Sequence, residues 1–227
     1  MKYAKLSLLF IFLFFFQLFS IYQQSSQLQL IALGLFGITL AATFIHSTKL
    51  KGRFHKRLFA GIIFSIVGNY FLLHVGLDSN QQLSSFVVLL LCHICYTSAF
   101  YLDFCSAPEL DKKGARMAIG IVFLFCIGFY FYFRPHLGAA RVPFLAYTIT
   151  ISFMMMMAAF RHFRVNEPSF KLILMGAVLF LLSDVLATAY LFLGSSSQTL
   201  LLSTATFMAA QYLITIGGIE RQLLRKD

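Results

Sequence analysis

The chain has 227 residues, of which 59% are hydrophobic and 11% are charged. This composition excludes a soluble globular domain and is typical of a polytopic membrane protein. A formal net charge of +10 would suit nucleic acid, but in a membrane protein the positions of Lys and Arg report topology first. We therefore expect a single integral membrane domain over residues 1–227, with no nucleic-acid partner and no evident protein partner.

Eight apolar runs, separated by short polar breaks, follow one another along the chain. Most are long enough for a helix, at 1.5 Å per residue, to cross a hydrocarbon core about 30 Å thick. The first run follows Lys2 and Lys5 as a signal peptide would, but its apolar core is too long, so we interpret it as a retained helix. The predicted fold class is all-α, with transmembrane helices at about residues 6–22, 28–45, 58–75, 83–104, 115–133, 142–160, 172–193 and 199–218.

Basic residues lie almost entirely on one side of the predicted bundle. Sixteen of the 18 Lys and Arg fall near the two ends of the chain or in the breaks after the second, fourth and sixth runs. Only Arg134 and Arg141 fall on the opposite side. By the positive-inside rule, both ends of the chain are cytoplasmic. The expected location is the bacterial inner (cytoplasmic) membrane.

The seventh run, from Leu172 to Leu193, contains a single formal charge, Asp184. A carboxylate near the centre of a membrane helix costs about 2.5–3.5 kcal/mol on insertion scales, so it needs a compensating role. Helical spacing places Asp184 beside Gly176 and Ser183, whose small side chains favour close packing, so it should face the bundle interior. Burial favours the neutral carboxyl, which is a proton donor. The alternative is an interhelical hydrogen bond without chemistry.

Three other runs carry polar side chains at a similar depth. These are Asn69 in the third run, His93 and Tyr96 in the fourth, and Gln211 and Tyr212 in the eighth. Taken singly, such a residue more often joins helices than contacts a ligand. Together with Asp184 they predict a cavity near the bilayer midplane that is closed to bulk water, lined by Asn69, His93, Asp184 and Gln211.

The third and seventh runs also resemble each other. Gly61 precedes Asn69 by eight residues, and Gly176 precedes Asp184 by eight residues. Because the two helices run in the same direction, this pattern suggests a parallel repeat of two four-helix halves. Chance similarity between apolar segments is the alternative.

Several of these segments, taken in order, resemble a known family. They are FSIVGNYFLL, LLCHICYTSAFY with its His-x-x-Tyr pair, PFLAYTITISFMM with Tyr147, GAVLFLLSDVLA with Ser183 and Asp184, and AAQYLI. Over about Phe59 to Gly218 the chain resembles the YhhN-like lysoplasmalogenases, eight-helix integral membrane proteins. The resemblance implies a lysophospholipid substrate and hydrolysis of the vinyl-ether bond of lysoplasmalogens to a fatty aldehyde and a glycerophospho head group.

The resemblance implies two acidic positions within the membrane, one in the third helix and one in the seventh. At the first, this chain has Asn69 where the family pattern has Asp, and an amide neither donates nor accepts a catalytic proton near neutral pH. Three explanations stay open: Asp184 suffices alone, the substitution traps an inactive state, or a natural relative binds without turnover.

The chemistry of vinyl ethers suits these residues. Vinyl ethers resist bases but hydrolyse in acid. The slow step protonates the β-carbon and gives an oxocarbenium ion, which water then captures. Asp184 fits the acid, and a carboxylate at position 69 would stabilise the ion, as in glycosidases. The remaining candidates for substrate contact are His93, Tyr96, Tyr147, Ser183, Gln211 and Tyr212.

No metal or nucleotide motif occurs in the sequence, so we expect no cofactor and no metal. The alternative function is a proton-coupled transporter or a lipid-binding membrane protein without catalysis. An intramembrane Asp and a parallel repeat also fit carriers.

Overall fold

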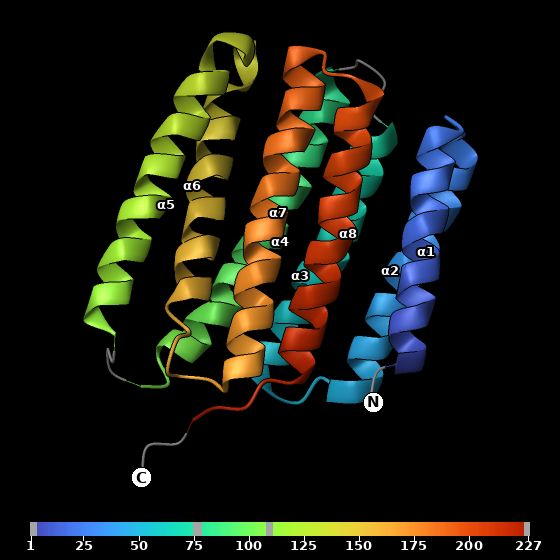
Figure 1. The fold of residues 1–227 in the computed structure, drawn as a ribbon. Coiled ribbons are helices and arrows are strands. Elements are labelled where there is room, and N and C mark those ends of the chain that lie inside the picture. The colour runs from blue at the N-terminus through green and yellow to red at the C-terminus, as the bar shows by residue number, and fades with distance from the viewer. Residues whose placement is uncertain (1–3, 75–78, 108–110, 225–227) are drawn as a thin grey trace.

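The computed structural model describes residues 4–74, 79–107 and 111–224 as an all-helical bundle (Figure 1). Its described α-helices are α1 (Ala4–Tyr22), α2 (Ser26–Thr48), α3 (Gly52–His74), α4 (Ser79–Phe104), α5 (Lys112–Phe133), α6 (Arg141–Ala159), α7 (Glu167–Leu193) and α8 (Ser197–Ile219). Two 3₁₀ turns, Arg134–His136 and Gly138–Ala140, join α5 to α6. The predicted all-α class with eight helices is confirmed.

Several helices begin before the apolar runs that predicted them. The helix α5 begins three residues earlier than expected because Asp111 caps it, accepting a hydrogen bond from the Gly114 amide at 2.8 Å. The helix α7 begins at Glu167, with Pro168 in its first turn, where proline needs no backbone donor. Helix-forming polar residues therefore extend the spans beyond the hydrocarbon segment.

Within the described residues, α2, α4, α5, α6, α7 and α8 are long and apolar enough to cross a membrane. The described apolar part of α1, Ser7–Tyr22, is shorter, and the first turns of α3 carry Arg53, Lys56 and Arg57. The helices thus define an integral membrane protein, whereas eight complete spans stay a prediction.

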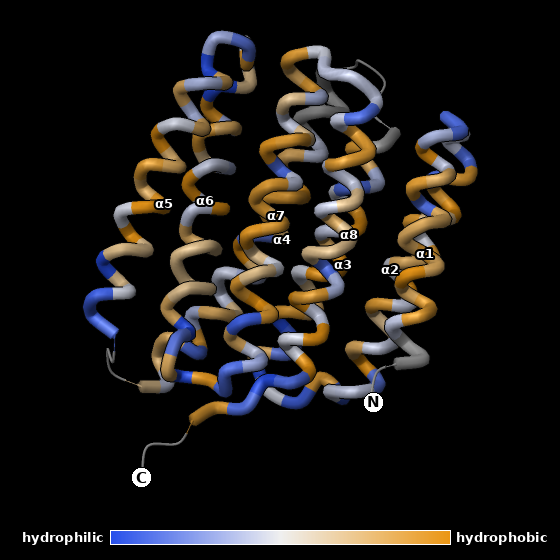
Figure 2. Tube along the Cα trace, in the orientation of Figure 1, coloured by the Kyte–Doolittle hydropathy of each residue, from blue (hydrophilic) through white to orange (hydrophobic). Residues whose placement is uncertain are grey.

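Both described ends of the chain lie at the same end of the bundle (Figure 1). The connections α2–α3 and α6–α7 lie at that end as well. Hydropathy along the trace shows largely apolar helix shafts, with hydrophilic residues gathered towards the ends (Figure 2). This arrangement agrees with the basic asymmetry of the sequence. The orientation in the membrane stays a prediction, and we call the end that holds both chain ends the basic end.

The closest helix pairs are α3 with α4 and α7 with α8, and glycines permit both approaches. A Cβ on Gly61 of α3 would lie 2.5 Å from the ring of Tyr96 on α4. A Cβ on Gly176 of α7 would lie 2.7 Å from Ile214 on α8. The two glycines that suggested a repeat therefore serve equivalent packing positions. The repeat itself stays a prediction.

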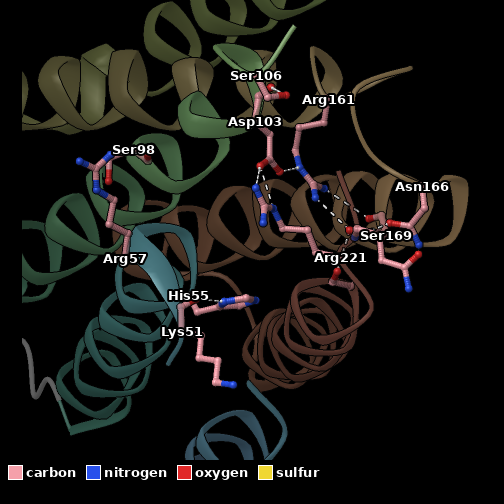
Figure 3. Close-up of polar contacts among 12 residues, drawn as sticks. Lys51, His55, Arg57, Ser98, Asp103, Ser106, Arg161, Asn166, Ser169 and Arg221 are labelled. Atoms are coloured by element: carbon pink, nitrogen blue, oxygen red, sulfur yellow. Dashed lines mark hydrogen bonds and ion pairs between the residues drawn. The ribbon is translucent and has the colours of Figure 1, made fainter. Parts of the chain in front are cut away.

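An ion cluster joins several segments at the basic end (Figure 3). The carboxylate of Asp103, near the end of α4, is fully buried. Its Oδ2 accepts a hydrogen bond from Nε of Arg161 at 2.8 Å, and its Oδ1 accepts one from Nε of Arg221 at 2.7 Å. Arg161 also donates to the Ser169 hydroxyl at 2.9 Å, and that hydroxyl donates to the Gly217 carbonyl at 2.7 Å. We call Asp103, Arg161, Ser169 and Arg221 the Asp103 cluster.

The segment after α8 is held against the α6–α7 connection by main-chain hydrogen bonds. The amide of Asn166 donates to the Gln222 carbonyl at 2.9 Å, and the amide of Leu224 donates to the Arg164 carbonyl at 3.0 Å. The Asn166 side chain accepts from the Gln222 amide at 2.8 Å. These bonds keep Arg221 beside Asp103, so the cluster and the terminal segment support each other.

Candidate functional site

Asp184 lies on the inward face of α7. Its side chain is 4% exposed, and the residues that share its face are buried. On the opposite face, Leu182 is 43% exposed. The stripe of small residues thus packs against the bundle, as the helical spacing predicted, and carries the carboxyl away from lipid.

Asp184 lies beside His93 of α4. The Nε2 atom of His93 lies 3.1 Å from Oδ2 of Asp184. This distance is that of an ion pair, although neither atom has a well-aligned hydrogen-bond partner among the described residues.

Two side chains of α6 complete the surroundings of this pair. Nδ1 of His93 lies 3.4 Å from Sδ of Met154, a weak acceptor. The hydroxyl of Tyr147 interacts with the Asp184 carboxyl. Three helices (α4, α6 and α7) therefore meet at the Asp184–His93 pair. Here "the Asp184 site" means Asp184, His93, Tyr147 and Met154.

Aromatic rings enclose the site. The His93 ring centroid lies 4.9 Å from that of Phe180 and 5.3 Å from that of Tyr147. All three side chains are at most 1% exposed. In surroundings of such low polarity, electrostatic interactions are stronger than in water.

A second polar pair also lies near Phe180. The hydroxyl of Tyr96 donates to Oε1 of Gln211 at 2.6 Å, and both side chains are fully buried. The Phe180 ring lies 6.1 Å from that of Tyr96, and so touches both polar pairs. Nε2 of Gln211 has no hydrogen-bond partner among the described residues, so one amide donor at this depth is available to a water or a ligand.

Asn69 of α3 is also buried, at 5% exposure, and its amide nitrogen lies 3.5 Å from the Ser65 carbonyl of its own helix. Gly68 packs against Leu89, which sets the register of α3 against α4. At 1.5 Å per residue, this register places Asn69 about 7 Å further from the basic end than His93. The single cavity predicted for Asn69, His93, Asp184 and Gln211 stays a prediction.

The remaining two candidates are engaged in helix packing. The hydroxyl of Tyr212 lies 2.7 Å from that of Ser7, joining α8 to α1. The hydroxyl of Ser183 donates to the Ser203 carbonyl at 2.9 Å, joining α7 to α8. Among the described residues, no group of three His, Cys, Asp or Glu side chains could hold a metal ion.

Two features of this region are not predictable from the sequence patterns above. Met154 belongs to a run of four methionines, and nothing in that run marks the one that contacts His93. The Asp103 cluster was missed as well, although an acidic residue on the basic side of the bundle is a usable signal. Its partners Arg161 and Arg221 are too distant in sequence to be recognised.

An all-helical membrane bundle with a buried carboxyl–imidazole pair is the class that these observations define. The model of the YhhN family matches residues 28–218, from the first turn of α2 to the last turn of α8. The chain therefore belongs to the YhhN family, as the segments around Asn69, His93 and Asp184 predicted. The helix α1 lies outside the matched range. No curated protein and no solved structure matches the chain.

Proposed function

We propose that this protein is an intramembrane hydrolase that cleaves the vinyl-ether bond of lysoplasmalogens. The observation that carries the proposal is the buried carboxyl of Asp184, 3.1 Å from the His93 imidazole inside an aromatic enclosure. Membership of the YhhN family supports a membrane protein compatible with this activity.

In the proposed reaction Asp184 acts as general acid. The neutral carboxyl donates its proton to the β-carbon of the vinyl ether, and the charge that develops is an oxocarbenium ion at the α-carbon. Water adds to that carbon and returns a proton to the Asp184–His93 pair. The hemiacetal then collapses, the glycerol oxygen takes up a proton, and the products are a fatty aldehyde and the glycerophospho head group.

The other polar groups have supporting roles in this proposal. Tyr147 interacts with the Asp184 carboxyl and orients it. The unpartnered Nε2 of Gln211, held in place by Tyr96, can direct the attacking water or a head-group oxygen. Asn69 cannot supply the second carboxylate that the family pattern has, so the ion is stabilised less and turnover is slow.

The test is aldehyde release by the purified protein in detergent. A lysoplasmalogen should release aldehyde, whereas the matched alkyl-ether lysolipid should not, because it lacks the double bond that accepts the proton. Release from neither lipid, together with substrate-coupled proton flux in proteoliposomes, would replace the hydrolase by a carrier.

The Asn69→Asp variant separates slow catalysis from none. A second carboxylate near the developing cation should raise the rate of aldehyde release by about 10²-fold, the lower end of what an acid–base group contributes. The matched control is Asn166→Asp, an amide-to-carboxyl change at the basic end that should leave the rate unchanged. If Asn69→Asp leaves the rate at the level of the parent, position 69 has no part in the reaction.

A further inference from the structure

A groove separate from the Asp184 site lies between α5, α6 and α7 at the basic end. Its volume is about 440 Å³, within the range of about 300–1,000 Å³ typical of small-molecule sites. The apolar walls are formed by side chains of all three helices. They include Met117, Ile121, Met155, Ala159, Leu174 and Val178.

The length of the groove matches one leaflet of a bilayer. On α5 its lining runs from Gly114 to Val122, nine residues whose ends lie about 12 Å apart along the helix. Half of a hydrocarbon core is about 15 Å thick. The groove is also open towards the membrane, since Met117 and Ile121 on its α5 wall are each 62% exposed. Its apolar part is therefore in contact with the acyl chains of the leaflet at the basic end.

The mouth of the groove at the basic end is polar. Nδ1 of His162 lies 2.9 Å from Oδ2 of Asp111, and both residues line the groove. Arg164 lines it as well, its guanidinium 4.7 Å from the Phe104 ring centroid and its Nε donating to the Ala107 carbonyl at 3.1 Å. Lys113 lies one turn before Met117 on the same side of α5, next to the groove lining. The described lining thus holds one carboxylate, one permanent cation and one imidazole, and Lys113 adds a second cation beside it.

We propose that this groove binds a phospholipid of the leaflet at the basic end, with one acyl chain along the apolar walls and the phosphate beside Lys113 and His162. Arg164 adds positive charge, while its hydrogen bonds to backbone carbonyls keep it in place. A phosphate is the head-group element that this charge pattern attracts, because a neutral head group gains nothing from the cations.

The bound chain would also explain how α5 is held. The helix α5 packs on α6 but not closely on α7. Only 11% of the apolar stretch of α5 that could cross a membrane is buried. A lipid chain in the groove fills the space between α5 and α7. The site is independent of the proposed hydrolase activity, and either can fail without the other.

The chain contains no Trp, so a single introduced Trp reports one position without background. Ile121→Trp places the reporter in the groove wall. Leu124→Trp is the matched control, one turn along the same helix, 70% exposed and outside the groove lining. Each variant is kept in a maltoside detergent, which has no phosphate, and a small amount of phosphatidylglycerol brominated in its acyl chains is added. We expect several-fold stronger quenching at position 121 than at position 124.

The head-group assignment is tested with brominated diacylglycerol, which lacks the phosphate, and with the Lys113→Glu/His162→Gln pair in the Ile121→Trp background. Both changes should reduce quenching at position 121 to the level at position 124. Equal quenching at the two positions would overturn the site. Strong quenching at position 121 by diacylglycerol, or in the charge variant, would overturn phosphate recognition.

Discussion

Two buried carboxyls, Asp103 and Asp184, have opposite surroundings. Each oxygen of Asp103 accepts a hydrogen bond from a different arginine, and Arg161 is further satisfied by Ser169. Asp184 instead faces one imidazole at 3.1 Å and one tyrosine, and its Oδ2 has no aligned hydrogen bond among the described residues. A carboxylate compensated on both oxygens is held in one state, whereas a sparsely compensated one can change its protonation.

The charge balance of the two regions differs as well. The Asp103 cluster contains two arginines for one carboxylate, and burial lowers the pKa of Arg161 while the adjacent Asp103 opposes that shift. Arginine has so high an ordinary pKa that Arg161 stays charged beside Asp103. The Asp184 site pairs one acid with one imidazole, 3.1 Å apart. The two carboxyls therefore differ in the number of cations that compensate them, and the proposed reaction uses the less compensated one.

The largest effect that this contrast predicts belongs to Asp184→Asn. The amide keeps the shape but has no acidic proton, so aldehyde release should fall by about 10²–10⁴-fold. The matched control is Glu167→Gln, an acid-to-amide change at an exposed residue at the start of α7, and it should leave the rate unchanged. Binding of a lysolipid should survive in both variants, because burial of the chain does not depend on the carboxyl. Full aldehyde release by Asp184→Asn would remove this residue from the mechanism.

Asp103→Asn should show the reverse pattern. Loss of the charge leaves two arginines without their counter-ion, one of them fully buried, and breaking a buried pair costs about 3–5 kcal/mol. Thermal unfolding in detergent should therefore shift down strongly, while the rate per folded molecule stays close to that of the parent. A large loss of rate in a variant that melts normally would mean that the cluster is not structural.

The sequence predicted most of the fold because membrane helices are specified locally. Apolar length gave the spans, and the small-residue face of α7 predicted that Asp184 points inward. Helix ends were displaced by up to six residues, as at α3, because polar residues such as Arg53 and Lys56 form the first turns of the helix before its apolar run. The apolar run alone does not show how far such polar turns extend.

The site was predictable only in part. Depth along each helix selected His93 and Asp184, which the structure brings together, and Tyr96 and Gln211, which it also pairs. The depth of Asn69 along α3 could not show that this residue lies further from the basic end than His93 does. That position depends on the register of α3 against α4, which is set by Gly68 against Leu89. Register is a property of two helices and cannot be predicted from either one alone.

Tyr96→Phe should have an intermediate effect. It removes the hydroxyl that donates to Gln211, leaving a fully buried amide oxygen without that donor, which costs about 1–3 kcal/mol. Unfolding should therefore be shifted moderately, and less than by Asp103→Asn. Tyr132→Phe, at a tyrosine 65% exposed on α5, is the control and should be neutral. A shift as small as the control's would show that the Gln211 amide finds another partner, which would weaken its proposed role with water.

The smallest effect belongs to Asp111, a surface carboxyl that contrasts with both buried ones. The Gly114 amide and then His162 stabilise its charged form and hold the pKa of Asp111 below its ordinary value. Because the folded pKa is the lower one, the stabilisation is fully present above about pH 4, the ordinary Asp value, and is lost as the pH falls through the folded pKa. Asp111→Asn should therefore lower the melting temperature slightly at pH 7, and the parent and variant should converge once the pH falls below the folded pKa of Asp111. Salt should shrink the difference at pH 7, since the pair is solvent-exposed. A difference that persists at low pH would show that the Asp111 side chain acts through packing rather than charge.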